Sequence, residues 1–417
     1  MRVRDVVEAS LERIGADELN CWKFLDPEHA RAQADALDAS GNRDAPLFGV
    51  PVGVKDIVDT ADMPTENGSP LCAGRRPQRD AWVVSRLREA GAVILGKTVT
   101  TEFACFAPLG GTRNPHDPER TPGGSSSGSA AAVAAGMVPL AIGSQTNGSV
   151  IRPASFCGVH GFKPTMGLIP RTGFLTTAHS LDHPGMFADS LEGIALLMEV
   201  LAGYDPDDPT TSPKARRAFR KFVAEGPAAP PRLAFVRGPT WDMAEPATVT
   251  AFERLAAKLS AREVALPAEF DDAVAVHRTL WTTELAFHLR RFLPEGRAQM
   301  SPELLALIDA GQATDAQTYL RALATRKDLI ASLDRLFADY DAILTPAAPG
   351  EAPKGIGATG SPAFCTLWSL TGVPAISLPL LTAPSGMPMG VQLVGAPGDD
   401  ARLLANARWV REALSLG

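Results

Sequence analysis

The sequence contains little cysteine, and the few cysteines are scattered. Five of them are spread over 417 residues, and no two form a C-x-x-C pair. Dispersed cysteines in odd number argue against a disulfide framework and against a zinc site with thiolate ligands. This usage fits a reducing compartment, so we expect a cytoplasmic protein.

A long hydrophobic run and an excess of basic residues are also missing. The longest run of small, apolar residues, 130–143, is too short to span a bilayer and contains Gly136 and Pro139. The N-terminus begins an amphipathic helical pattern rather than the apolar segment of a signal peptide. The formal charge of −7 disfavours a general nucleic-acid binder, which normally carries a basic patch. We therefore expect neither a membrane span nor a nucleic-acid partner.

The seven histidines form no recognisable metal-binding motif. His179 and His183 are four positions apart, but Pro184 follows them and no glutamate stands between them as in H-E-x-x-H. The other histidines are isolated in the sequence. We therefore predict a protein without a metal site and without a cofactor.

Helical and extended patterns alternate along the chain, which favours an α/β fold. A helical pattern over 81–90 leads into a buried apolar strand over 92–97, and a short strand is predicted at 49–55. The elements expected near the two ends are a helical region at 1–40, strands at 342–344, 374–380 and 390–394, and a helix at 400–414.

The middle of the chain has a different character. Residues 205–231 are loop-like, with repeated Pro, Asp and Ala, and residues 246–340 are mainly helical in pattern. Because strands are predicted near both ends, we expect distant segments to close one sheet. The sequence therefore predicts a single domain over 1–417, with a mainly helical sub-lobe around 205–340.

A loop rich in glycine and serine, residues 121–129, is the most informative stretch. Its glycines allow the backbone to approach a ligand closely, whereas a flexible linker is the ordinary alternative. The alanine-rich helical pattern that starts at Ala130 argues against a linker. Gly123 and Gly128 have P-loop spacing, but Ser129-Ala130 replaces the Lys-Ser/Thr pair that a phosphate site needs.

The same loop formally matches the G-x-S-x-G pattern of a nucleophile elbow, centred on Ser126. Such an elbow needs a strand directly before it, and the preceding residues 114–120 form a polar loop instead. An esterase built on Ser126 with a histidine and an aspartate is therefore a weak alternative.

Residues 143–153 combine small side chains with Ser149 and Arg152. Successive backbone N–H groups in such a turn can form an oxyanion hole beside the Ser149 hydroxyl. Taken alone, the stretch is equally well explained as an ordinary turn with a structural arginine.

Lys55 stands among apolar neighbours at the end of the strand predicted at 49–55. Burial lowers the pKa of a lysine and can make it a base at neutral pH. Taken alone, the position is better explained by a surface lysine, or by one paired with Asp56.

Together, these three stretches resemble the amidase signature family. Residues 49–56 resemble its lysine motif, 123–129 its Gly/Ser-rich motif and 144–153 its nucleophile motif. Ser125 and Ser149 are 24 positions apart, as in the family, and the similarity runs over nearly the whole chain. The resemblance implies one α/β domain with a mixed central β-sheet surrounded by helices.

The resemblance also implies a set of site residues and a reaction. Ser149 corresponds to the nucleophile that is acylated, and Lys55 to the general base. Between them the family has a bridging serine, here Ser125, which follows a cis peptide bond. The backbone N–H groups implied to face the oxyanion are those of Thr146, Asn147 and Gly148. The implied reaction is hydrolysis of an amide C–N bond through an acyl-enzyme.

The implied substrate contacts are Arg152 and Gln145, and Gln145 replaces the aspartate of many family members. Arg152 follows Ser149 by three residues, as in the malonamidase branch, which the chain resembles most. There the arginine position suits a substrate carboxylate, which arginine can bind through two hydrogen bonds. The resemblance thus implies a small amide that bears an acidic group, such as a malonamate. Cys365 and Trp368 are expected to line the acyl pocket.

Asn147 stands where many members have glycine. Its side chain either serves a left-handed backbone or contacts the substrate. The segments 147–149 and 181–185 also resemble hydrolases of biuret-type ureido acids, and amidotransferase A-type subunits resemble the chain too, so both stay as alternatives. The expected partner is a small-molecule amide substrate, and a homodimer is left open.

Overall fold

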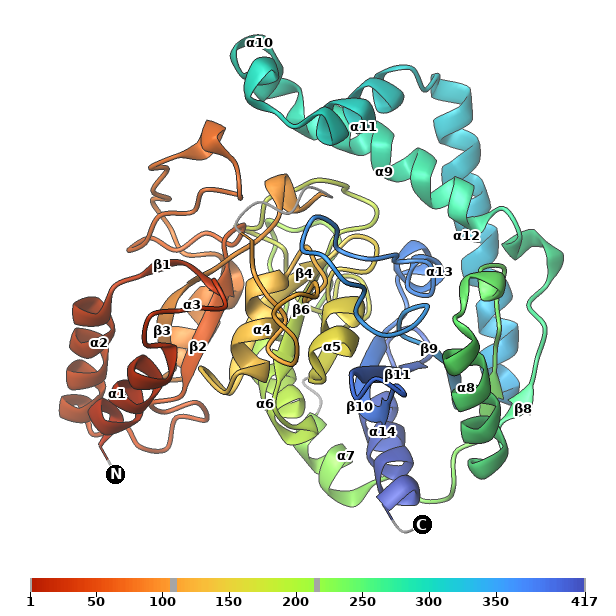
Figure 1. Ribbon diagram of the computed structural model, residues 1–417, viewed down its shortest axis with the longest axis horizontal. Coiled ribbons are helices and arrows are strands. Elements are labelled where there is room, and N and C mark those ends of the chain that lie inside the picture. The colour runs from red at the N-terminus through yellow and green to blue at the C-terminus, as the bar shows by residue number, and fades with distance from the viewer. Residues whose placement is uncertain (1, 106–110, 214–217, 416–417) are drawn as a thin grey trace.

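The centre of the computed structural model is a mixed sheet of 11 strands, in the order β1-β3-β2-β4-β6-β5-β10-β11-β9-β7-β8 (Figure 1). The structure describes residues 2–105, 111–213 and 218–415. Pairing is parallel between β2 and its neighbours β3 and β4, and antiparallel from β4 through β6, β5, β10 and β11 to β9. The strands are β1 Trp22–Leu25, β2 Pro51–Lys55, β3 Val93–Thr98, β4 Leu140–Gln145, β5 His160–Lys163, β6 His183–Ala188, β7 Leu233–Phe235, β8 Arg262–Glu263, β9 Ala342–Pro346, β10 Ala375–Thr382 and β11 Pro388–Val394.

Helices surround this sheet, and α9, α11 and α12 lie along its outer side in Figure 1. The predicted α/β class with a mixed central sheet is confirmed. Helix α7 falls inside the stretch 205–231, for which only a loop is predicted. The α-helices are α1 Val3–Ile14, α2 Pro27–Ser40, α3 Trp82–Glu89, α4 Ser127–Ala134, α5 Ile151–Cys157, α6 Leu191–Leu201, α7 Phe219–Glu225, α8 Pro246–Lys258, α9 Ala273–Leu289, α10 Leu293–Gly296, α11 Pro302–Gln312, α12 Ala316–Asp339, α13 Thr366–Thr371 and α14 Asp400–Ser415.

Strands from distant parts of the chain join in one sheet, as expected. β10 pairs antiparallel with β5, so that Ile376 lies opposite Phe162. β5 pairs in turn with β6, and β6 with β4. The strands after residue 340 are therefore hydrogen-bonded to those of the first half of the chain.

The helical prediction over residues 1–40 is wrong in its centre. α1 ends at Ile14, and Asp17 and Asn20 then adopt the left-handed region with φ of 47° and 54°. The Asp17 carboxylate accepts the N–H groups of Cys21 at 2.8 Å and Trp22 at 2.9 Å, where β1 begins. β1 is a four-residue strand at the edge of the sheet, too short to give a periodic signal.

Two parallel strands bring the lysine motif and the nucleophile motif to one edge of the sheet. β2 and β4 pair from Val52 opposite Leu140 onward, so their carboxyl ends lie together. β2 ends at Lys55 and β4 ends at Gln145, and both strands are buried along their whole length. The carboxyl ends of parallel strands are where α/β folds commonly bind ligands.

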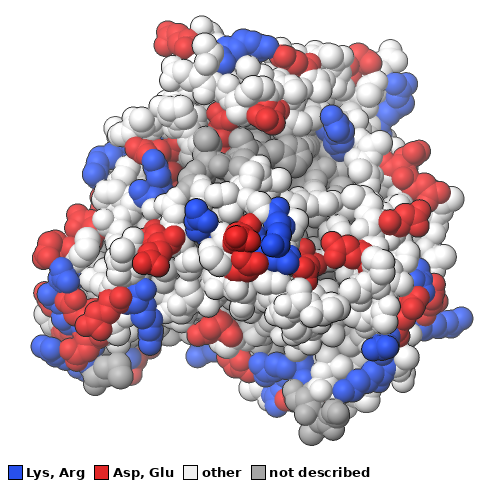
Figure 2. Space-filling model, viewed as in Figure 1, with Lys and Arg blue, Asp and Glu red and all other residues white. Residues whose placement is uncertain are grey.

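Several features of binding proteins are absent from the described ranges. No helix there combines the length and the apolarity that crossing a bilayer requires. No group of three or more His, Cys, Asp or Glu side chains among these residues is placed to hold a metal ion. On the face seen in Figure 2, acidic and basic side chains are intermingled rather than gathered by sign.

Candidate active site

Lys55 is fully buried at the end of β2 and contacts two serine hydroxyls. Its Nζ lies 2.7 Å from Ser125 Oγ and 2.9 Å from Ser144 Oγ. Burial removes water from the ammonium group and lowers the pKa of Lys55 to about 7, against the opposing charge of Asp182. A large share of Lys55 is therefore neutral near pH 7, as a general base must be.

Ser125 lies in the Gly/Ser loop that leads into α4. The peptide bond between Gly124 and Ser125 is cis, in agreement with the resemblance. Ser125 is 2% exposed. A Cβ added to Gly124 would lie 2.6 Å from Thr359 Cγ2, so the close packing of this loop requires glycine at that position.

Ser126, the centre of the esterase alternative, is engaged in packing. Its hydroxyl donates to the Ser144 carbonyl at 3.2 Å and accepts the Ser144 N–H at 3.3 Å. The side chain is fully buried, and a loop rather than a strand precedes it. This hydroxyl fixes α4 to β4 and offers no approach to a substrate.

Ser149 lies in the turn between β4 and α5 and is half-buried. Among the residues that the structure describes, its hydroxyl makes no hydrogen bond. The turn begins where β4 ends, at the sheet edge that also holds Lys55. The hydroxyl therefore lies at the same edge as the buried base and is free to react.

The side chain of Gln145 braces the Ser149 turn from inside. Its Oε1 accepts the N–H groups of Val150 at 2.8 Å and Ile151 at 3.0 Å. Its Nε2 donates to Ser369 Oγ at 3.0 Å, and the Ser369 hydroxyl donates to the Asn147 carbonyl. These described bonds are internal, so the substrate contact predicted for Gln145 stays a prediction.

We expect Gln145→Leu to lower both stability and activity. The change leaves two buried N–H groups without an acceptor, which costs about 1–3 kcal/mol for each group. The turn loses its support, so kcat should fall by about ten-fold or more. Urea unfolding and initial rates check the two effects, with Gln145→Glu as the control that keeps the acceptor. Wild-type stability in Gln145→Leu would contradict the bracing role.

Thr146 is held from two sides by residues that the sequence did not single out. Its hydroxyl donates to Asp182 Oδ1 at 2.6 Å, and His277 Nε2 donates to its carbonyl at 3.1 Å. Burial lowers the pKa of His277 to about 4, so the ring is neutral at pH 7. Asp182 lies in the segment 181–185, whose resemblance to biuret-type hydrolases was a signal for it. His277 comes from α9 and has no sequence motif.

Arg152 is buried, and its described bonds are internal. Its guanidinium donates to the carbonyls of Gly360 at 2.7 Å and Gly124 at 2.5 Å, and to Thr359 Oγ1 at 3.1 Å. Burial lowers the pKa of Arg152 to about 10, so the group stays charged at neutral pH. The carboxylate contact predicted for Arg152 stays a prediction beside this second role, which is to hold the carbonyl that precedes Ser125.

The two residues expected to line the acyl pocket are both buried. Cys365 is fully buried, and its thiol contacts the Ala347 carbonyl at 3.3 Å. A Cβ added to Gly148 would lie 3.3 Å from Cys365 Cβ, so this cysteine packs against the Ser149 turn. Trp368 is 3% exposed in α13. Contact of either residue with an acyl group stays a prediction.

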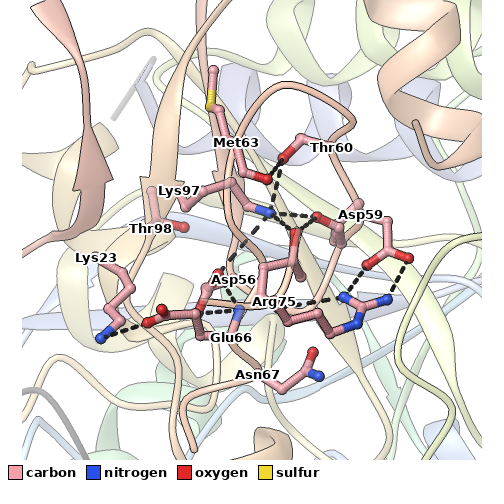
Figure 3. A network of polar contacts seen from close by, with 12 residues as sticks. Lys23, Asp56, Asp59, Thr60, Met63, Glu66, Asn67, Arg75, Lys97 and Thr98 are labelled. Carbon is pink, nitrogen blue, oxygen red and sulfur yellow. Dashed lines mark hydrogen bonds and ion pairs between the residues drawn. The ribbon is translucent and has the colours of Figure 1, made fainter. Parts of the chain in front are cut away.

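A second buried lysine, Lys97 on β3, belongs to a separate polar network (Figure 3). Its Nζ donates to the Val58 carbonyl at 2.6 Å and to Thr65 Oγ1 at 2.5 Å, and it lies 4.0 Å from Asp56 Oδ1. Burial lowers the pKa of Lys97 to about 8 and raises the pKa of Asp56 to about 6. These contacts anchor the segment after β2, and Lys55 is the lysine that faces the serines.

Comparisons with known proteins agree over nearly the whole chain. The family model Amidase matches residues 5–404. AtzE of Pseudomonas sp. (strain ADP), which belongs to 1-carboxybiuret hydrolase, is 37% identical over 96% of this chain and 93% of its own length. The A-type component of the glutamyl-tRNA(Gln) amidotransferase of Chloroflexus aggregans is 36% identical over 96% of this chain and 91% of its own.

A solved structure agrees with these relatives. It is described as an unexpected vestigial protein complex that reveals the origins of an s-triazine catabolic enzyme. It superposes with a TM-score of 0.92 at 34% identity, over 99% of this chain and 95% of its own. The likeness of sequence, fold and site leads to one conclusion: the chain belongs to the amidase signature family and is a hydrolase of carbon–nitrogen bonds.

Proposed function

We propose that the chain hydrolyses small amides through a relay of Ser149, Ser125 and Lys55 and an acyl-enzyme. The observation that carries the proposal is the buried contact of 2.7 Å between Lys55 Nζ and Ser125 Oγ. A serine hydroxyl is a weak nucleophile until a base takes its proton. A lysine can be that base only when neutral, and burial lowers the pKa of Lys55 to about 7.

In acylation, the Ser149 oxygen attacks the amide carbonyl carbon while its proton moves to Ser125. The Ser125 proton moves to neutral Lys55, whose remaining N–H donates to Ser144. The backbone N–H groups of residues 146–148 stabilise the oxyanion. Return of the proton through Ser125 to the leaving nitrogen releases ammonia or an amine. Water then cleaves the acyl ester by the same relay and restores Ser149.

The substrate that we propose is a small carboxamide or ureido acid whose acyl side carries a second carbonyl group. Malonamate and 1-carboxybiuret both place a carbonyl or carboxylate two bonds from the scissile carbonyl carbon. The relative that belongs to 1-carboxybiuret hydrolase supports this class. Wild-type hydrolysis of malonamate and biuret, scored by ammonia release, is the expected result, and simple fatty amides are expected to react more slowly.

The role of Arg152 is tested by Arg152→Ala on two amides. Because its described bonds support Gly124 and Gly360, we expect a common fall in kcat of about ten-fold or more on malonamate and on shape-matched 3-methylbutanamide. Arg152→Lys keeps a charge but loses the planar donor set, and it should fall in the same way. A loss confined to malonamate would instead establish the carboxylate contact implied by the resemblance.

The amidotransferase A-type role is the second candidate, because components of that kind are among the relatives. Such a component works with partner chains, so its activity alone should be low. Purified chain that releases ammonia from small amides without additions supports the hydrolase. Activity that requires partner chains would favour the amidotransferase role. The homodimer stays a prediction.

A further inference from the structure

Asn147 stands between two residues whose N–H groups are proposed to face the oxyanion. It is not among the residues with positive φ in the described chain, so its side chain does not serve a left-handed backbone. Glycine would meet the backbone requirement of this position equally well. The amide side chain therefore has to be explained by what it contacts.

Helix α13 fixes Asn147 at two points. The Thr366 hydroxyl donates to Asn147 Oδ1 at 2.8 Å, and the Ser369 hydroxyl donates to the Asn147 main-chain carbonyl. Ser369 is itself held by Gln145, so both anchors belong to the brace of the Ser149 turn. The amide plane is thus oriented before any ligand arrives.

This orientation leaves the other end of the amide unused. Nδ2 has no hydrogen-bond partner among the residues that the structure describes. It is also absent from the described side-chain atoms that are both buried and unpartnered, and Asn147 is half-buried. An oriented donor with access to solvent, one residue from Gly148 and two from Ser149, is placed to meet a bound substrate.

We propose that Asn147 Nδ2 binds the second carbonyl or carboxylate oxygen of a 1,3-dicarbonyl substrate; this rests on the proposed function. In such a substrate, a bent conformer brings the second oxygen beside the scissile carbonyl oxygen. The scissile oxygen takes backbone N–H groups of residues 146–148, so the second oxygen lies next to the same turn. A neutral amide donor serves a malonamate carboxylate and a ureido carbonyl alike.

The test compares two amides of matched shape, malonamate and 3-methylbutanamide, which differ in the oxygen acceptors. The selectivity ratio is kcat/KM for malonamate divided by kcat/KM for 3-methylbutanamide. Asn147→Gly removes the donor, and Asn147→Asp keeps the acceptor for Thr366 but turns the free end into an acceptor. We expect both changes to lower the ratio by about 10- to 100-fold, as for a hydrogen bond to a charged group.

Thr366→Val is the matched control, because it leaves Asn147 in place but removes its anchor. We expect the selectivity ratio to fall by a few-fold only, in the same direction. An unchanged ratio in Asn147→Gly and Asn147→Asp overturns the proposal, as does a wild-type enzyme that prefers 3-methylbutanamide. Ser149→Ala separates the two levels. If it stays active, the proposed function fails; if it is inactive while the ratio never changes, only the role of Asn147 fails.

Discussion

Ser149→Ala is expected to lower kcat by about 10⁴- to 10⁶-fold while the protein keeps its fold. Without the hydroxyl no acyl ester forms, and only the binding and the oxyanion donors of the turn remain. The structural cost is small, because the Ser149 hydroxyl makes no hydrogen bond among the described residues. Ammonia release measures kcat, and thermal unfolding checks the fold.

Ser127→Ala is the control for this loss. Ser127 belongs to the Gly/Ser loop and has one long hydrogen bond of 3.4 Å, to the Val99 carbonyl. Its replacement should leave kcat within a few-fold of wild type. A folded Ser149→Ala protein that keeps kcat within 100-fold of wild type would exclude Ser149 as the nucleophile.

Lys55→Ala is expected to lower kcat/KM by about 10²- to 10⁴-fold, the usual contribution of a general base. It should also change the pH profile. Burial lowers the pKa of Lys55 to about 7, so the neutral base accumulates as the pH rises through 7. In the wild type, kcat/KM should therefore rise along a limb centred near pH 7 and level off above about pH 8. The residual activity of Lys55→Ala should lack this limb.

Lys97→Met is the control for the lysine. Lys97 is as deeply buried as Lys55, but its partners are the Val58 carbonyl and the hydroxyls of Thr60 and Thr65. Its loss should affect stability and leave the position of the limb near pH 7 unchanged. A limb that survives in Lys55→Ala and disappears in Lys97→Met would assign the base to the wrong lysine.

Short-range patterns predict the strands that hold the site well. β2 and β3 follow the apolar runs at 49–55 and 92–97 closely, because both strands are buried on both faces. β1 is missed because four edge residues carry no period, and a side chain outside the strand, Asp17, fixes its start. α7 is missed because it is a short helix within a stretch rich in loop formers.

The candidate site divides in the same way. Lys55, Ser125 and Ser149 lie in motifs that are readable locally, and the fold brings the motifs of Lys55 and Ser149 to one sheet edge. The supports of the turn are not readable, because His277 and Thr366 come from helices more than 100 residues away in sequence. Their contacts are created by packing alone. The side-chain bonds of Gln145 and Arg152 likewise depend on tertiary partners.

The central claim is that Ser149 is acylated with Lys55 as the base behind it. Mass spectrometry of the active protein after reaction with a fluorophosphonate probe tests it most directly. We predict one adduct, on the peptide that carries Ser149, with loss of activity in step with labelling and much slower labelling in Lys55→Ala. An adduct on Ser126 or a cysteine instead, or no adduct on an active enzyme, would contradict the account.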